Sequence, residues 1–272
     1  MNDEELTEDE FIRNGISQDT SIEERNMFDT IQKLVLDHVA KGGHDYSPDP
    51  LEYRASSIGT CSRKILLEKN LGQYLDEKDM LQLPMWYQEQ LVDKEDHLDF
   101  GAHVAGQVIH ETIQDALQGT LLSMEEEVSI QVGNATLKGH YDLLMELDNG
   151  EKIVIDIKST KSPRKYLPNH KHLRQLMAYQ AMLGGIRGAL LYVDRDSFRM
   201  TYVSQAFDKE KFSRLTVKLT QLAQYEENEQ LPPPIPEFDY ECQSISWQCQ
   251  FYEFCFPNNS EDELPDIADT ID

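Results

Sequence analysis

The sequence predicts an α/β (α+β) protein in which a mixed central β-sheet is flanked by helices. Short runs with strand character fill the middle of the 272-residue chain. Longer segments with apolar residues at helical spacing precede, separate and follow these runs. Such an alternation is typical of a sheet covered by helices. The length allows one large domain or two modest ones, at roughly 100–200 residues per domain.

The N-terminal part is expected to begin with an acidic, flexible arm at residues 1–25. A helix is expected at about residues 22–40. Residues 56–71 are predicted to form a loop that turns into a helix around Cys61. The highly charged segment 76–99 receives no assignment.

The central region supplies the expected sheet and its helices. In chain order these are a helix Phe100–Leu117, strands Val128–Val132, Ala135–Leu147 and Lys152–Ile157, a helix Asn169–Leu183, strands Gly188–Val193 and Met200–Phe207, and a helix Lys209–Tyr225. The Asp148-Asn149-Gly150 segment is a strong hairpin signal. A proline-rich stretch then leads to a terminal cysteine region.

Charge is distributed unevenly along the chain. The formal net charge of −25 argues against a simple nucleic-acid binder, because phosphate contacts need Lys and Arg. Acidic residues gather at the two ends, however, and none lies between Ile157 and Val193. That segment carries basic residues including Lys161, Arg164 and Lys165. A solvated basic face is one interpretation; we favour a patch that faces phosphate, because the segment adjoins the strongest motif.

That motif combines two carboxylates and a lysine. Gly139-His140-Tyr141-Asp142 is followed, on the next expected strand, by Asp156-Ile157-Lys158. Side chains two apart on a strand point to one face, so Asp156 and Lys158 should lie together. Two nearby carboxylates can bind Mg²⁺ or Mn²⁺, which would activate water for phosphodiester hydrolysis, and a lysine can stabilise the developing charge. An exposed hairpin with chance charges is the alternative interpretation.

The hairpin register decides whether Asp142 reaches the same face. A two-residue loop would place it opposite Ile157, on the wrong side. A three-residue loop, Asp148–Gly150, would place it opposite Asp156. We predict the three-residue loop, in which a glycine adopts the left-handed conformation.

Two further pairs lie four residues apart on expected helices and therefore share a helix face. Gly106 would let its helix approach the sheet closely, and His110 could complete the coordination of a metal. Gln175 and Tyr179 could hydrogen-bond phosphate or the lysine. A satisfied core histidine and ordinary helix packing are the alternatives for the two pairs.

The order G-x-x-x-H, G-x-x-D, D-x-K, Q-x-x-x-Y, spanning Gly106 to Tyr179, resembles the RecB-like branch of the PD-(D/E)XK nucleases. The resemblance implies a restriction-endonuclease-like fold. It also implies roles for seven residues: metal ligation by His110, Asp142, Asp156 and the backbone oxygen of Ile157, catalysis by Lys158 with the two aspartates, and support and DNA contact by Gln175 and Tyr179. The chain departs from the pattern in two places: no proline precedes Asp142, and Asp156 stands where many members have Glu.

The chain has four cysteines: Cys61, Cys242, Cys249 and Cys255. Disulfides are disfavoured in a cytosolic chain, and four thiolates can hold zinc or an iron–sulphur cluster, with buried free thiols as the alternative. One cysteine before the core and three after it resemble the CRISPR-associated exonuclease type of iron–sulphur nuclease. That likeness implies a structural 4Fe–4S cluster joining the N- and C-terminal segments. The gap between Cys242 and Cys249 is longer than is common there.

These patterns together predict a Mg²⁺- or Mn²⁺-dependent deoxyribonuclease, with a single-strand exonuclease as the leading expectation. Residues 26–256 would form one nuclease domain with its core at about 100–207, followed by an acidic tail at 257–272. Expected partners are DNA, as single strands or ends, and proteins of recombination, repair, phage replication or CRISPR spacer processing. The expected location is the cytoplasm of a bacterium, an archaeon or a phage-infected host, without a membrane segment. A non-catalytic iron–sulphur module that binds DNA ends or partners is the alternative.

Overall fold

The computed structural model describes residues 49–85, 87–88, 100–161, 167–235, 242–244 and 247–257. All of them belong to one compact unit, Ser47–Asp272. The expected arm at 1–25, the helix at 22–40 and nearly all of the acidic tail lie outside the described residues. No helix in the described part of the chain has the length and apolar character needed to span a membrane.

A five-stranded sheet with the strand order β2-β5-β6-β7-β8 forms the centre of the fold. Its strands are β2 (Leu121–Met124), β5 (Leu143–Glu146), β6 (Lys152–Thr160), β7 (Arg187–Asp194) and β8 (Met200–Gln205). Only β6 and β7 run parallel, so the sheet is mixed, as predicted. Parallel neighbours need a crossover connection, and helix α8 (His170–Met182) lies within it.

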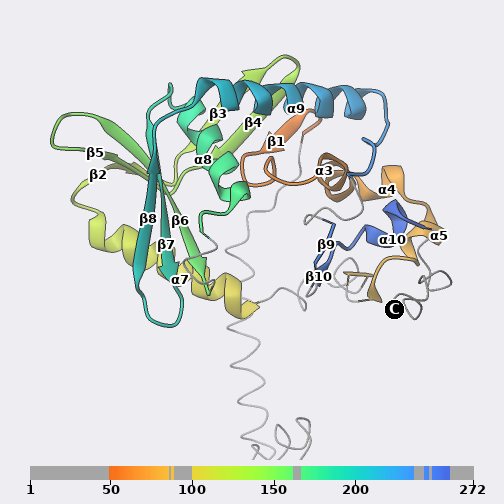
Figure 1. Cartoon of the computed structure of the whole chain (residues 1–272), viewed down its shortest axis with the longest axis horizontal. Helices are drawn as coiled ribbons and strands as arrows, with labels where there is room; N and C mark the ends of the chain where they lie inside the picture. The colour runs from red at the N-terminus through yellow and green to blue at the C-terminus, as the bar shows by residue number, and fades with distance from the viewer. Residues whose placement is uncertain are drawn as a thin grey trace, which may run out of the picture. The chain divides into compact units, whose positions relative to one another are not determined.

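Helices cover the two faces of this sheet (Figure 1). On one face, helix α7 (Phe100–Leu117) packs Ile109 and Ile113 against Leu143 and Ile157. On the other face, α8 contributes Leu176 to the larger apolar core. Predicted helices and strands therefore form the expected layers.

A second sheet, of order β1-β4-β3, changes one prediction. Its strands are β1 (Glu52–Arg54), β3 (Glu127–Val132) and β4 (Ala135–His140). The expected single strand Ala135–Leu147 is wrong: the chain leaves this sheet after β4 and enters the five-stranded sheet as β5. Buried Tyr141 marks the break, with its hydroxyl 2.7 Å from Ser123 Oγ and donating to Glu126 at 2.8 Å.

The segments β2–β3 and β4–β5 nevertheless keep one register across the break. Met124 lies opposite Leu143 in the five-stranded sheet, and Glu127 lies opposite His140 in the other. Two residues on each side separate these pairs, so Glu125 falls opposite Asp142. We call this bend, Glu125–Glu126 with Tyr141–Asp142, the sheet crossing.

The remaining elements surround the cysteines. They are α3 (Ser62–Lys69), α4 (Leu71–Tyr74), α5 (Glu77–Met80), β9 (Gln243–Ser244), β10 (Trp247–Gln248) and α10 (Tyr252–Cys255). Helix α9 (Lys209–Glu227) contacts α8, α3 and strands β3 and β4, and so connects this region to the core (Figure 1). Of these elements, the sequence predicted only α3 and α9.

The loop before Cys61 is held by cations from two helices. Arg174 of α8 donates to the carbonyl of Gly59 at 2.6 Å. Lys218 of α9 donates to the carbonyls of Ile58, at 2.9 Å, and Thr60. A Cβ added to Gly59 would lie 2.9 Å from the backbone Cα of Lys171, which leaves no room for a side chain.

We therefore expect Gly59→Ala to lower the free energy of unfolding by about 1–3 kcal/mol, because the loop or α8 must move to relieve the overlap. The control is Gly72→Ala in α4, where an added Cβ meets no atom within 4 Å. This control should be neutral or stabilise the protein by about 0.5–1 kcal/mol. Urea unfolding followed by circular dichroism measures both, and equal stabilities of the two variants would contradict the contact.

Candidate active site

The β5–β6 hairpin is closed by the three-residue loop Asp148–Gly150. Leu147 N donates to Glu151 O at 2.8 Å, and the last loop residue is a glycine with φ +79°. Counting back along the antiparallel ladder from this pair places Asp142 opposite Asp156. The predicted register is confirmed.

Strand β6 presents Asp156 and Lys158 on one face and buries Ile153 and Ile157 on the other. Lys158 Nζ lies 2.9 Å from Asp156 Oδ2, and Asp156 is only 1% exposed. Burial raises the pKa of this carboxyl above its usual range, an effect that the Lys158 charge opposes and the nearby Asp142 reinforces. A buried, paired carboxylate is the kind of group that functional sites contain.

Asp142 is buried and connects β6 to helix α7. One carboxylate oxygen accepts a hydrogen bond from the backbone N–H of Ile157, and the other lies 3.5 Å from His110 Nδ1. Burial alone would lower the pKa of His110, but the hydrogen bond and charge of Asp142 outweigh it and raise that pKa. A metal ion that binds through this nitrogen would compete with protonation, which Asp142 favours.

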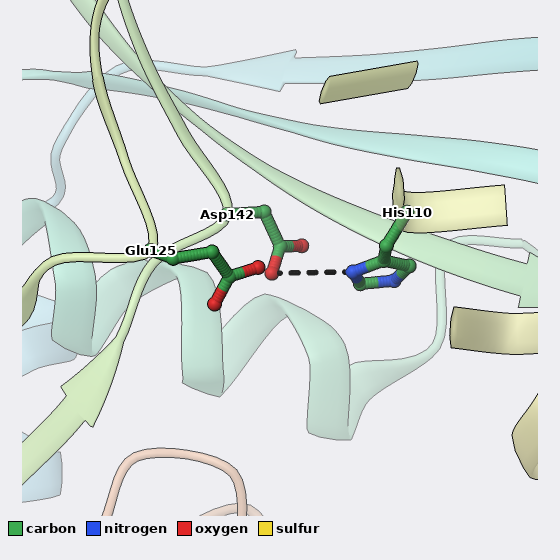
Figure 2. A group of neighbouring side chains, drawn as sticks. All are labelled: His110, Glu125 and Asp142. Atoms are coloured by element: carbon green, nitrogen blue, oxygen red, sulfur yellow. Dashed lines mark ion pairs between the residues drawn. The ribbon is translucent and has the colours of Figure 1, made fainter. Parts of the chain in front are cut away.

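Glu125 completes a cluster that the sequence motifs did not include. Potential ligand atoms of His110, Glu125 and Asp142 all lie within 4.8 Å of one another, and Figure 2 shows the three side chains converging. Glu125 holds φ at +51°, a left-handed conformation that is unusual for a non-glycine residue and is often found at functional sites. Gln114 of α7 donates to its carboxylate at 2.6 Å.

The sheet crossing therefore lines up three carboxylates across neighbouring strands. Glu125 lies opposite Asp142, which in turn lies opposite Asp156. His110 and Lys158 are the basic side chains beside this row. Carboxylate oxygens with one imidazole nitrogen fit a divalent cation such as Mn²⁺, and the repulsion between neighbouring carboxylates would favour its binding.

Gln175 and Tyr179 lie on the face of α8 that is turned inward. Gln175 Nε2 donates to the Tyr179 hydroxyl at 3.1 Å, and both side chains are buried. A Cβ at Gly139 would lie 2.9 Å from the Tyr179 ring, so the glycine of G-x-x-D makes room for this tyrosine. Their packing fits the predicted supporting role, whereas their contact with DNA stays a prediction.

Gly106 has a similar role on α7. A Cβ at this position would lie 3.3 Å from Ser159 Oγ of β6, so the glycine allows helix and strand to approach closely. One helical turn later, the same helix places His110 beside Asp142.

Comparison with known proteins identifies the family. Residues 67–256 match the PD-(D/E)XK nuclease superfamily. The chain belongs to this superfamily.

Two proteins similar to this superfamily member share under 30% of its residues in the aligned regions. The CRISPR-associated exonuclease Cas4 of Saccharolobus solfataricus is 28% identical over 158 residues, covering 56% of this chain and 70% of Cas4. Among solved structures, the crystal structure of SSO0001 aligns with a TM-score of 0.56 at 21% identity, covering 85% of this chain and 98% of that one. The second likeness concerns the fold alone.

The basic segment of this PD-(D/E)XK protein is only partly described. Lys161 is exposed and lies 3.7 Å from Asp196. Arg164 and Lys165 lie outside the described residues, so the predicted phosphate contacts of all three stay predictions. Arg174, from the same acid-free segment, instead binds the carbonyl of Gly59.

All four cysteines line one pocket. Cys61 precedes α3, and Cys255 ends α10. Cys242 and Cys249 flank the β9–β10 hairpin, and Cys249 N donates to Cys242 O at 2.8 Å. The long spacing noted in the sequence thus accommodates a small hairpin. Arg63 Nε, in the same pocket, is buried without a hydrogen-bond partner among the described residues.

His172 lies at the start of α8, beside the site. Its Nδ1 is 3.0 Å from the Tyr192 hydroxyl, and Tyr192 lies opposite Lys158 in the β6–β7 ladder. Burial, followed by the charges of Lys158 and Lys171, lowers the pKa of His172 to about 4. The folded protein therefore keeps this imidazole neutral over a pH range in which an unfolded chain protonates it.

This difference predicts that stability falls as the pH falls from 6.5 toward 4, since the unfolded state binds the additional proton. Above pH 6.5 this residue contributes no pH dependence. His172→Gln should reduce the slope of unfolding free energy against pH in that window, whereas His170→Gln, which removes an exposed imidazole from the same helix, should keep the wild-type slope. Urea titrations at several pH values test this, and identical slopes for wild type and His172→Gln would refute it.

Proposed function

We propose that this superfamily member is a Mg²⁺- or Mn²⁺-dependent deoxyribonuclease that acts on single strands or DNA ends. The observation that carries the proposal is the row of three carboxylates that runs from the sheet crossing to β6, with a histidine and a lysine beside it. That set suits phosphodiester hydrolysis, which needs a hard cation, a water molecule and compensation of negative charge.

His110, Asp142 and Asp156 would hold the ion, with the backbone oxygen of Ile157 as a further ligand. Glu125 joins this proposed set because a carboxylate oxygen of Glu125, a ring nitrogen of His110 and a carboxylate oxygen of Asp142 all lie within 4.8 Å of one another. When bound, the ion would polarise the phosphoryl oxygen and lower the pKa of a coordinated water. The N–H of Ile157 orients Asp142 by donating to its carboxylate.

Lys158 would be the catalytic lysine. Its ammonium group lies 2.9 Å from the Asp156 carboxylate, and its side chain is 19% exposed. A cation held in this way can stabilise negative charge that develops on a phosphate, because few waters compete for it. Tyr179 and Gln175 support the site from α8 through their mutual hydrogen bond.

An exonuclease acting in recombination, repair, phage replication or CRISPR spacer processing is the finer form of this proposal. Its support is the motif order and the similarity to a protein named as a CRISPR-associated exonuclease. A cytoplasmic location, and partner proteins of those processes, belong to the same proposal.

Cleavage of end-labelled single-stranded DNA with Mn²⁺ tests the activity. Asp156→Asn and Lys158→Met should each lower the rate about 100-fold or more, the typical effect of removing one group that stabilises the transition state. Lys152→Met is the matched control. This exposed lysine lies on the same strand, on the same face as Asp156 and Lys158, but at the other end of the strand from the site. If all three variants cleave as fast as the wild type, the enzyme proposal fails, and a binding role remains.

We further propose that the four-cysteine pocket holds a 4Fe–4S cluster. Four thiols around one pocket match the ligand set of such a cluster. Burial raises the pKa of Cys249 and Cys255, so the thiolates would need the bound iron and nearby cations for compensation. Arg63 and Lys64, which line the pocket, supply those cations. A cluster joining Cys61 to the C-terminal cysteines would stabilise the fold by constraining the unfolded chain.

Anaerobically purified protein should then be brown and contain about four iron and four sulphide per chain. Cys255→Ser should lose the visible absorption and unfold at a lower urea concentration. Asp142→Asn, which changes the other site, should retain the iron and the colour. Stoichiometric zinc without iron, after production in iron-supplemented medium, would show that the thiols form a zinc site instead.

A further inference from the structure

A groove lies between α8, the end of β8 and the first half of α9. Its volume is about 530 Å³. The charged and ionisable residues that line it are His170 and Arg174 of α8, Asp208, and Lys211, Arg214 and Lys218 of α9. Four permanent cations therefore face one carboxylate, in a chain whose net charge is −25.

Two of these cations are fixed in position. Arg174 and Lys218 donate to the carbonyls of the loop before Cys61, which fixes where these two side chains lie along the groove. The fold therefore sets the positions of two of the cations before any ligand binds.

The other two cations are exposed and adjustable. Lys211 lies 3.1 Å from Asp208, and Arg214 lies 2.9 Å from Glu210 on the preceding helical turn. All four side chains of these pairs are more than 40% exposed, so the pairs are weak and can exchange for an incoming anion. A phosphate group would gain contacts here without breaking a buried interaction.

The groove and the metal site share helix α8. Gln175 and Tyr179 are turned inward beneath the site, whereas Leu173, Arg174 and Met177 line the groove. One helix, about 10–12 Å wide with its side chains, therefore contributes residues to both places.

We propose that this groove binds the phosphodiester backbone of the substrate strand a few nucleotides away from the bond that is cleaved. The inference rests on the proposed function and extends it, because it assigns a second contact for DNA. Phosphate contacts of this kind hold a strand without reading its sequence, which suits a nuclease acting on any sequence. The groove favours a nucleic-acid strand because its cations come from two helices, and one of these helices also carries the residues beneath the metal site.

The test is equilibrium binding of fluorescein-labelled single-stranded DNA, 20 nucleotides long, measured by anisotropy in EDTA so that no cleavage occurs. The variant is Lys211→Gln with Arg214→Gln, and the matched control is Lys209→Gln, an exposed lysine of the same helix that does not line the groove. The double variant should bind at least about fivefold more weakly. Its slope of log affinity against log salt should be shallower by about 1.4, or 0.7 for each lost phosphate contact.

Base sequence supplies the second arm of the test. The deficit of the double variant should be equal for a labelled oligo-dT and for a mixed-sequence 20-mer, because phosphate contacts do not read bases. Wild-type affinity and salt slope, a deficit confined to one of the two sequences, or an equal deficit in Lys209→Gln would each overturn the proposal. Because binding is measured without turnover, a chain that fails to cleave DNA yet shows the deficit would refute the proposed nuclease activity and leave the groove assignment standing.

Discussion

Mutual repulsion among carboxylates at the sheet crossing is the constraint on which the site depends. Glu125, Asp142 and Asp156 lie in one row, and two of them are buried. Such a row is unfavourable unless positive charge or hydrogen-bond donors compensate it. Lys158, the N–H of Ile157 and the imidazole of His110 supply part of this compensation.

The crossing also explains why the surrounding elements lie where they do. Each of the two paired segments leaves one sheet and enters the other at the same level. Glu125 and Asp142 lie between the strands there, and Glu125 N donates to Asp142 O at 3.3 Å. Helix α7 then approaches closely enough to bring its histidine to Asp142, because Gly106 adds no side chain against Ser159. On the opposite face, Gly139 admits the ring of Tyr179. Two glycines without functional side chains therefore determine where His110 and Tyr179 lie.

Much of this arrangement followed from local rules. Strand periodicity placed Asp156 beside Lys158, and the loop chemistry of Asp148–Gly150 fixed the register of Asp142. Glu125 was missed because the expected strand began only at Val128, after the acidic run. The sequence does contain a signal for this residue. The Gly133-Asn134 turn pairs Val132 with Ala135, and extending that antiparallel pairing away from the turn places Glu125 opposite Asp142. The strand break at Tyr141 depends on burial against distant residues, which no local pattern reports.

The shared register restricts insertions and deletions in two surface turns of this chain. Surface turns usually tolerate insertions and deletions, because the loop itself packs against little. Here the turns at Gly133-Asn134 and Asp148–Gly150 lie far along their strands from the acidic row, yet one residue more or fewer in either would displace a carboxylate to the opposite face. The length of these two turns is therefore fixed by the need to keep the three carboxylates aligned. A homologue with a longer turn should carry a bulge in the same hairpin that restores the alignment.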